Sequence, residues 1–262
     1  MPDLYEDVAR WQPEKFLENP AILKRFALAA QLIPEPSQTL LDVGTGNGAF
    51  LRYVEDQPGP QYLTGLEHAH AAMASAVCQT AIIPGDIERL PFADQSFSIV
   101  TALEVIEHLP YRVYEQGLAE LERVARDHII ISVPYLEIWR QVRCPYCGCC
   151  FHKNYHLRRY DEAIVRNLFS AFRCEKTVRV DIPEYAIMPL VRAARQLYDP
   201  YLPFPSDTIC PQCGYSRSQD RVDPSSKSKS DVATKVTRLI PLRKRTRWII
   251  GLYRRTDSAT GR

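Results

Sequence analysis

The 262-residue sequence lacks a long apolar run. Its longest uncharged stretch, residues 68–85, contains Gln79 and Pro84, so it is unsuited to a membrane-spanning helix, which needs about 20 predominantly apolar residues. The first residues are acidic and show no apolar segment of the kind found in secretory signals. The sequence therefore predicts a cytoplasmic protein.

The sequence also lacks a strong net charge. Its 33 basic and 31 acidic residues give +2 at pH 7, which by itself favours neither nucleic acid nor a membrane as partner. The average hides an asymmetry: residues 221–262 hold 12 Lys or Arg against 3 Asp or Glu, a net +9, which leaves −7 for residues 1–220. The acidic body argues against a nucleic-acid partner, whereas the basic C-terminal segment is compatible with a peripheral membrane contact.

Eight cysteines occur without an export signal, so we expect them to be reduced. Residues 144–148 and 210–214 share the pattern Cys-Pro-x-Cys-Gly, a tight turn that aims two thiolates at one ion. The spacing predicts a structural zinc site with four ligands, namely Cys144, Cys147, Cys210 and Cys213. Two independent thiol turns are the alternative, and the neighbouring Cys149, Cys150 and His152 could compete as ligands.

Strand-like and helix-like segments alternate from residue 39 onward. The strand candidates are residues 39–43, 62–67, 81–84, 97–103 and 128–133. The helical patterns cover residues 13–30, 48–56, 70–80, 111–126 and 161–171. Residues 176–182 alternate like a further strand. This alternation predicts an α/β fold with a parallel sheet and helices on both of its faces.

The first strand candidate runs into a glycine-rich turn. Gly44, Gly46 and Gly48 have the spacing G-x-G-x-G, which differs from the G-x-G-x-x-G of dehydrogenases. Glycines let the backbone approach a ligand closely, and the following helix start offers free N–H donors. Glu67 ends the second strand, 19 residues after Gly48, where a carboxylate can accept hydrogen bonds from ribose hydroxyls.

The sequence resembles the class I S-adenosylmethionine (SAM)-dependent methyltransferases in four motifs. These are LDVGTGNG (41–48), GLE (65–67), GDIERLPFADQSFSIV (85–100) and ALEVIEHLP (102–110). The resemblance implies a Rossmann-like seven-stranded fold and SAM as cofactor, with the glycine loop under the methionine portion and Glu67 on the ribose. Asp86 would bond the adenine amino group, with Ile87 against the ring. The implied cofactor-binding residues are Asp42, Gly44, Thr45, Gly46, Gly48, Glu67, Asp86, Ile87 and Leu103. A dehydrogenase, or a degenerate fold that binds no cofactor, is the alternative.

An acidic and imidazole cluster follows the fourth strand. On a helical turn Glu104, Glu107 and His108 would lie on one face, a set suited to magnesium, manganese, iron(II) or zinc. This stretch resembles two metal-dependent O-methyltransferase groups, one acting on catechol-type hydroxyls and the other on the 3′-terminal ribose of small RNAs. The second resemblance implies His156 as a fourth ligand.

The catalytic candidates are accordingly Glu107, His108 and His156. They would assist methyl transfer through a divalent ion, magnesium or manganese, that lowers the pKa of an acceptor oxygen. In a metal-free alternative, His108 or His156 acts as general base. A purely structural use of the cluster is a further alternative.

The first cysteine pair, followed by FHKNYHLR (151–158), resembles methyltransferases that accompany bacterial glycan-assembly enzymes. That resemblance implies O-methylation of a hydroxyl on a saccharide, a glycoconjugate or another small molecule. One alternative is a 2′-O-methyltransferase of small-RNA 3′-terminal riboses. Another is a non-catalytic zinc-binding interaction protein on a methyltransferase scaffold. The acceptor and the oligomeric state stay open at this point.

The C-terminal part begins with a serine-rich stretch without aromatics, residues 216–230, which predicts a linker. Residues 247–253 (RWIIGLY) are expected to form the final strand, which in the methyltransferase family is antiparallel and lies between the fifth and sixth. We expect a helical cap (1–34), a SAM-binding core (35–143), a zinc-knuckle and substrate-side segment with the sixth strand (144–214), a flexible linker (215–235) and a basic segment with the final strand (236–262).

Overall fold

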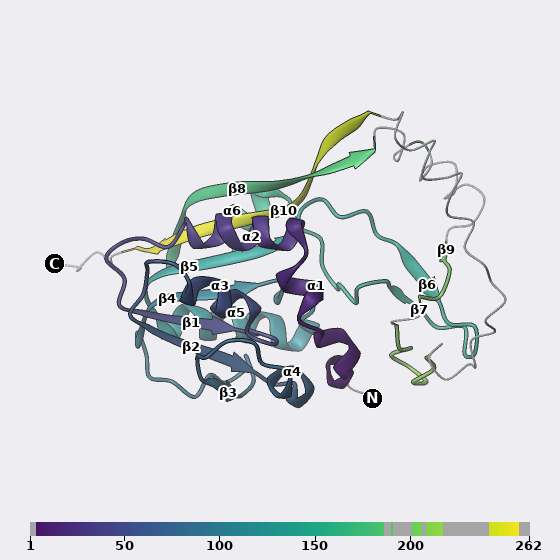
Figure 1. The fold of residues 1–262 in the computed structure, drawn as a ribbon, viewed down its shortest axis with the longest axis horizontal. Coiled ribbons are helices and arrows are strands. Elements are labelled where there is room, and N and C mark those ends of the chain that lie inside the picture. The colour runs from purple at the N-terminus through teal and green to yellow at the C-terminus, as the bar shows by residue number, and fades with distance from the viewer. Residues whose placement is uncertain (1–3, 186–189, 191–200, 206–207, 217–240, 257–262) are drawn as a thin grey trace. The chain divides into compact units, whose positions relative to one another are not determined.

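The computed structural model describes residues 4–185, 190, 201–205, 208–216 and 241–256 (Figure 1). The chain divides into two compact units. The larger, which we call the sheet unit, comprises residues Tyr5–Glu137, Leu157–Val180 and Arg247–Arg262. The smaller, which we call the knuckle unit, comprises residues Met1–Leu4, Ile138–His156 and Asp181–Thr246. Residues 217–235 of the predicted linker lie outside the described residues.

Seven strands form the large sheet in the order β3-β2-β1-β4-β5-β10-β8. They are β1 (Thr39–Val43), β2 (Tyr62–Glu67), β3 (Ile82–Pro84), β4 (Phe97–Leu103), β5 (Ala125–Pro134), β8 (Phe172–Tyr185) and β10 (Leu242–Arg255). The pairs among β1 to β5 are parallel, and β10 is antiparallel to β5. The predicted α/β fold, with its final antiparallel strand between the fifth strand and the next one, is confirmed.

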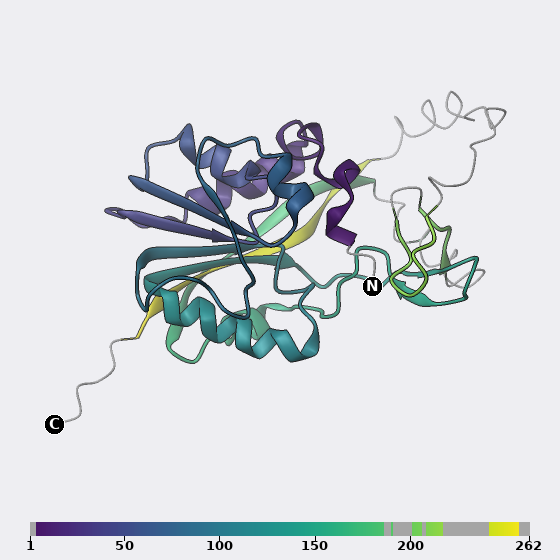
Figure 2. The same cartoon turned by 90° about the horizontal axis from the view of Figure 1, so that it is seen from below.

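Helices cover both faces of this sheet. Figure 2 shows α2 (Pro20–Ala30) and α3 (Ala49–Glu55) on one face, and α5 (Tyr111–Val124) and α6 (Glu162–Arg166) on the other. The short helices η1 (Leu4–Glu6), η2 (Val8–Trp11), α1 (Glu14–Leu17) and α4 (His70–Ala74) complete the set in the described residues. Because both faces are covered, the central strands are buried on both sides and mostly apolar; Ile129, Ile130 and Ile131 are fully buried.

Local chemistry sets where these helices begin and end. Asn19 caps α2 by accepting the Ala21 N–H, and Pro20 occupies the first turn, where its missing donor costs nothing. The helix predicted over residues 70–80 ends at Ala74. Beyond it, the carboxylate of Glu55 accepts the backbone N–H groups of residues 79 and 80, so those donors are satisfied outside a helix. The helix predicted over 161–171 likewise ends early, at Arg166.

The knuckle unit has a small sheet of its own, in the order β7-β6-β9. Its strands are β6 (Gln141–Arg143), β7 (Cys150–His152) and β9 (Tyr201–Leu202). The buried core among the described residues of this unit consists of Val142, Cys144, Phe204 and Cys210. Two of these four residues are cysteines, and the partly buried Phe151, Leu202 and Tyr215 pack against them.

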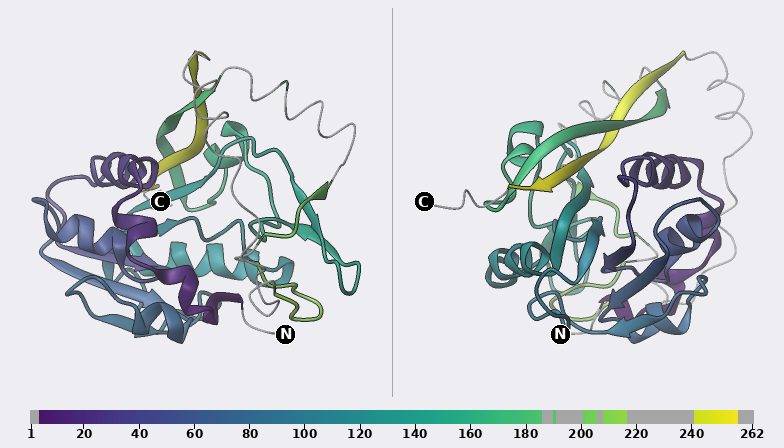
Figure 3. Two further views of the ribbon diagram at one scale, coloured as in Figure 1. Left: turned by 45° about the vertical axis from the view of Figure 1, so that its right-hand side comes forward. Right: turned by 90° about the vertical axis from the view of Figure 1, so that its left-hand side faces the viewer.

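Strands β8 and β10 run side by side (Figure 3). Near the end of β8 the buried carboxylate of Glu184 pairs with Arg243 at 3.1 Å and with Arg245 at 3.3 Å. The basic segment of β10 is therefore partly neutralised within the protein. None of the helices in the described residues combines the length and apolar character that a membrane crossing requires.

Candidate functional site

The loop between β1 and α3 requires its glycines. Gly44, Gly46 and Gly48 have φ values of 67°, 60° and 75°, in the left-handed region that other residues adopt at a cost. Space is short as well: a Cβ on Gly44 would lie 2.7 Å from Cγ2 of Val105, and one on Gly46 would lie 2.6 Å from the ring of Trp11. The loop thus packs closely against the segment after β4.

Glu67 lies beside this loop at the end of β2. Its Oε2 accepts the Gly46 N–H at 2.8 Å, and its Oε1 accepts the N–H groups of His68 and Ala69, each at 2.9 Å. Burial alone would raise the pKa of Glu67, but these hydrogen bonds and the His68 side chain outweigh it and hold the pKa below its usual value. Glu67 is therefore an anion, and its Oε2, which accepts only the Gly46 bond among these, has a lone pair left for a further donor.

Asp42 is buried next to the same loop, within β1. The hydroxyl of Thr101 donates to its Oδ1 at 2.5 Å. Burial raises the pKa of Asp42 to about 6, although the hydrogen bond from Thr101 opposes the rise. Asp42 therefore changes charge at a mildly acidic pH rather than near pH 4.

The other predicted cofactor residues follow the ends of neighbouring strands. The Thr45 N–H donates to the Leu66 carbonyl at 3.1 Å, which holds the loop against β2. Asp86 is exposed after β3, whereas Ile87 is half-buried against the core of the sheet unit. Leu103, also half-buried, ends β4. Because parallel strands β1, β2, β3 and β4 end at one edge of the sheet, these residues share that edge.

Glu104 differs from the expectation that it shares a helical face with Glu107 and His108. Its φ is 64°, a left-handed conformation, so no helical turn begins there. Its carboxylate accepts Nε1 of Trp248 at 2.5 Å and the Ser132 hydroxyl at 3.2 Å, and it pairs with Arg25 at 3.2 Å. Both carboxylate oxygens are thus engaged, which argues against Glu104 as a metal ligand.

Glu107 is fully buried within a turn after β4. Neither carboxylate oxygen has a hydrogen-bond partner among the described residues, and Nε2 of His108 lies 3.9 Å from Oε1. Burial, and next the charge of Glu104, raise the pKa of Glu107 well above its usual value. A buried polar group without a partner is costly, so this carboxyl group fits a role that needs an outside partner.

His156 belongs to the knuckle unit, whereas Glu107 and His108 belong to the sheet unit. Its ring stacks on that of His152, with centroids 4.8 Å apart. Nδ1 of His152 accepts the backbone N–H of His156 at 3.1 Å, so the neutral His152 ring carries its proton on Nε2. A metal site that joins His156 to Glu107 and His108 remains a prediction.

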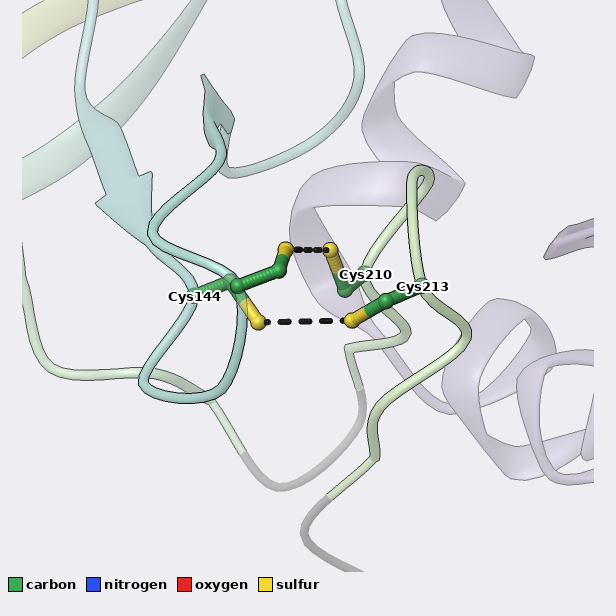
Figure 4. Close-up of side chains that lie close together, drawn as sticks. Cys144, Cys210 and Cys213 are labelled. Carbon is green, nitrogen blue, oxygen red and sulfur yellow. Dashed lines mark hydrogen bonds between the residues drawn. The ribbon is translucent and has the colours of Figure 1, made fainter.

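The four predicted zinc thiols lie together within the knuckle unit, and Figure 4 shows their arrangement. The sulfur of Cys144 is 3.7 Å from that of Cys213, and the sulfur of Cys147 is 3.6 Å from that of Cys210. A disulfide would require about 2.05 Å. Four sulfurs at about 2.3 Å from a tetrahedral zinc ion would be separated by about 3.8 Å, so the spacing fits zinc.

The two cysteine turns also have the same backbone geometry. The Gly148 N–H donates to the Cys144 carbonyl at 3.0 Å, and the Gly214 N–H donates to the Cys210 carbonyl at 2.9 Å. Both glycines have a φ of 74°. The sequence repeat is therefore a repeat of the fold, with each turn presenting two thiols to the same centre.

Two residues of the Glu104 cluster, Arg25 and Trp248, are not among the site residues that the sequence motifs indicate. The guanidinium of Arg25 lies 4.9 Å from the Trp248 ring centroid, and Arg25 is only 6% exposed. One signal was available: Arg25 is one turn before Ala29, which is fully buried, so it lies on the apolar face of α2. Its partners, Glu104 just after β4 and Trp248 in β10, are too distant in the sequence for a local pattern to connect them to Arg25.

Comparisons with known proteins identify the family of this domain. Residues 41–131 match the family described as a methyltransferase domain. A putative methyltransferase of Encephalitozoon cuniculi is 38% identical over 90 residues, which is 34% of this chain and 40% of that protein. An uncharacterized methyltransferase of Mycobacterium marinum is 29% identical over 141 residues, 51% and 52% of the two chains. The chain thus spans about half or less of the length of these relatives.

Solved structures share the fold. The N-methyltransferase NodS of Bradyrhizobium japonicum, in complex with S-adenosyl-L-homocysteine (SAH), is 13% identical, with a TM-score of 0.56 over 97% of this chain and 100% of that chain. A putative methyltransferase of Bacillus halodurans is 15% identical, with a TM-score of 0.52 over 87% and 97%. Residues 41–131 thus match the methyltransferase domain family, and the fold around them is that of solved SAM-dependent methyltransferases.

Proposed function

We propose that the protein transfers a methyl group from SAM to a hydroxyl of a saccharide or glycoconjugate. The observation that carries this proposal is the contact between the glycine loop and the segment after β4, where Val105 packs on Gly44. Val105 immediately precedes the turn that holds Glu107 and His108. The anionic Glu67 beside Gly46 supports binding of the cofactor ribose.

The chemistry needs a base for the acceptor hydroxyl and a fixed direction of attack. SAM, when bound, supplies the methyl group on a sulfonium leaving group. In the proposed reaction the imidazole of His108 takes the hydroxyl proton while the oxygen bonds to the methyl carbon. The Glu107 carboxyl lies 3.9 Å from Nε2 of His108. Because burial favours the neutral form of this carboxyl, it would fix the orientation of that ring rather than neutralise its charge.

A divalent ion, magnesium or manganese, is compatible with part of the predicted ligand set. Glu107 fits, because both of its buried oxygens lack partners among the described residues. Glu104 does not fit, because Trp248, Arg25 and Ser132 engage it. We therefore propose Glu107, His108 and His156 as the ligands in a metal-assisted variant, and activity that survives chelation with the true acceptor would exclude that variant.

A second metal, zinc, is proposed for the knuckle unit. The spacing of the four sulfurs and the paired geometry of the turns support a closed site of four thiolates, which is typical of structural rather than catalytic zinc. In this proposal zinc stabilises the knuckle unit, which would shape the acceptor side of the enzyme.

The acceptor class rests on the sequence after the first cysteine pair. Known relatives differ in acceptor, since a protein 30% identical over 140 residues is the cycloartenol-C-24-methyltransferase 1 of Oryza sativa. A chain of the complex between the Haloferax volcanii Trm112 methyltransferase activator and a putative methyltransferase is 18% identical, with a TM-score of 0.54 over 68% of this chain and 80% of that chain. At that identity the likeness concerns the fold alone.

A labelling experiment tests the proposed function. Cell extract is incubated with the protein and SAM labelled on the methyl group, and the products are digested separately with glycosidases and with ribonuclease. We expect label in the glycan fraction, and we expect its loss with His108→Gln. Label released by ribonuclease would support the RNA alternative, and a protein that fails to bind SAM would support the non-catalytic one.

We also propose a cytoplasmic protein with at most a weak membrane contact through β10. Glu184 neutralises part of the basic segment by pairing with Arg243 and Arg245. Exposed Lys244 and exposed Leu242 remain for an anionic lipid surface. Sedimentation with vesicles of anionic lipid, repeated with Lys244→Glu, would test this contact.

A further inference from the structure

Residues 5–11, which we call the N-terminal strap, lie across the glycine loop in the sheet unit. The ring of Trp11 is in contact with Gly46, where an added Cβ would come within 2.6 Å of Cζ3. The Asn47 side chain donates to the Trp11 carbonyl at 3.1 Å. The strap therefore contacts Gly46, one of the residues that the cofactor is expected to contact.

The strap is fastened by its own hydrogen bonds. Nε1 of Trp11 donates to the Tyr5 carbonyl at 2.7 Å, which fixes the two aromatic residues relative to each other. The carboxylate of Glu6 accepts the backbone N–H groups of His70 and Ala71 at 2.9 and 2.8 Å. These bonds lower the pKa of Glu6, so the fastening is charge-assisted at neutral pH.

The other end of the strap contacts the candidate base. The Tyr5 ring meets the His108 ring edge to face, with centroids 6.0 Å apart and an angle of 89°. It also meets the His68 ring, next to Glu67, at 5.7 Å. One short segment thus contacts the glycine loop through Trp11, the neighbour of Glu67 through Tyr5, and His108 through the same Tyr5 ring.

We propose that Tyr5 is a positioning residue for His108, and that the strap couples cofactor binding to the orientation of that imidazole. A ligand that binds beside Gly46 would change the position of the Trp11 ring. The hydrogen bond from Trp11 to the Tyr5 carbonyl would pass that change to the Tyr5 ring. Cofactor binding would then orient the His108 imidazole before the acceptor binds. The inference rests on the proposed function, because it assumes that SAM or SAH binds at the glycine loop.

The first test is calorimetry of the full chain with SAH. Trp11→Ala should weaken SAH binding about tenfold, which corresponds to the loss of one well-packed aromatic contact. Trp11→Phe keeps a ring on Gly46 and should restore most of the affinity. Val8→Ala is a matched control within the strap, since the Val8 side chain is 55% exposed. Unchanged affinity in Trp11→Ala, or tighter binding, would overturn the proposal.

The second test reads the His108 ring directly by NMR, with its signal assigned through His108→Gln. SAH should shift this signal in the native protein and in Tyr5→Phe, but by less than half as much in Tyr5→Ala. Equal shifts in all three proteins would overturn the role of Tyr5. Thermal unfolding of each variant checks that it is folded.

A third arm separates the inference from the proposed function. In the ligand-free protein, Trp11→Ala should already move the His108 signal, because the strap loses its contact with Gly46. A native protein that binds no SAH would contradict the proposed function alone. If Trp11→Ala leaves the His108 signal of the ligand-free protein unchanged, the proposed coupling through the strap is wrong, whether or not SAH shifts that signal.

Discussion

The two units of this protein are stabilised in different ways. The sheet unit buries a continuous apolar core between its sheet and helices, with fully buried residues such as Leu121, Ile129 and Ile131. The described core of the knuckle unit contains Val142, Phe204 and two thiols, Cys144 and Cys210. A segment with so little apolar material usually needs a metal or disulfides to fold.

The comparison indicates which unit depends on a bound ion. In the sheet unit, apolar burial supplies the stability and leaves polar groups such as Glu67 and Glu107 for chemistry. In the knuckle unit, the four-thiol site would itself supply the folding energy, because thiolates bind zinc only when the two turns are brought together. Removing the metal should therefore affect one unit far more than the other.

The largest expected effect is the loss of zinc. Cys144→Ser should abolish zinc binding and unfold the knuckle unit, since structural zinc sites contribute about 10–16 kcal/mol of binding free energy at pH 7. Metal analysis and NMR would show one zinc per chain in the native protein and none in the variant, with sheet-unit signals retained. Cys149→Ser, outside the four-thiol group, should keep its zinc. Native protein purified without chelator but free of zinc would refute this prediction.

Truncating a buried side chain of the sheet unit should lower the stability of that unit alone. Leu121→Ala should lower the free energy of unfolding of this unit by about 2–5 kcal/mol, because it leaves a cavity between α5 and the sheet. Urea unfolding measures the change, and metal analysis should find the zinc retained. Leu136→Ala, at a site 51% exposed, should change the free energy by less than about 0.5 kcal/mol. Zinc loss in Leu121→Ala would show that the units depend on each other.

The pH dependence of stability should identify Asp42 as a buried titrating group. Its pKa rises from 3.8 to about 6 on folding, so the folded state holds the proton more tightly than the unfolded state. Its contribution is present below about pH 4 and is lost as the pH rises through 6, by at most about 3 kcal/mol. Relative to Asp42→Asn, the native protein should lose stability between pH 4 and 7 in urea titrations. Parallel pH profiles for the two proteins would contradict this assignment.

The smallest of these effects concerns cofactor affinity. Glu67→Ala should weaken SAM binding at least tenfold, since a hydrogen bond to a charged group contributes about 1.5–3 kcal/mol. Calorimetry measures the change. The exposed Glu88 provides a matched control, and Glu88→Ala should bind SAM normally. If Glu67→Ala binds SAM with native affinity, Glu67 is not a cofactor ligand.

The sequence predicted much of the fold because the informative signals are local. Apolar runs mark β1, β2 and β4 with the bounds that the structure has, and the glycine spacing marks the loop that needs positive φ. The paired Cys-Pro-x-Cys-Gly turns predicted which thiols lie together. Each of these features depends on residues close in the chain or on a repeated pattern.

The rest depends on contacts between distant segments. The left-handed backbone of Glu104 and its binding by Arg25 and Trp248 join three elements that no local pattern connects. The strap is similar, because α2 and β1 lie between Trp11 and Gly46 in the sequence. Sequence patterns located the candidate residues, whereas packing decided which of them are already engaged.

The most direct test of the account is a calorimetric titration of SAH into the full chain, before and after removal of zinc by a chelator. The account predicts one SAH per chain in both samples, with binding lost or weakened at least tenfold in Glu67→Ala, because the cofactor site belongs to the sheet unit. No binding to the native, zinc-loaded chain would contradict the central claim that this glycine loop holds SAM.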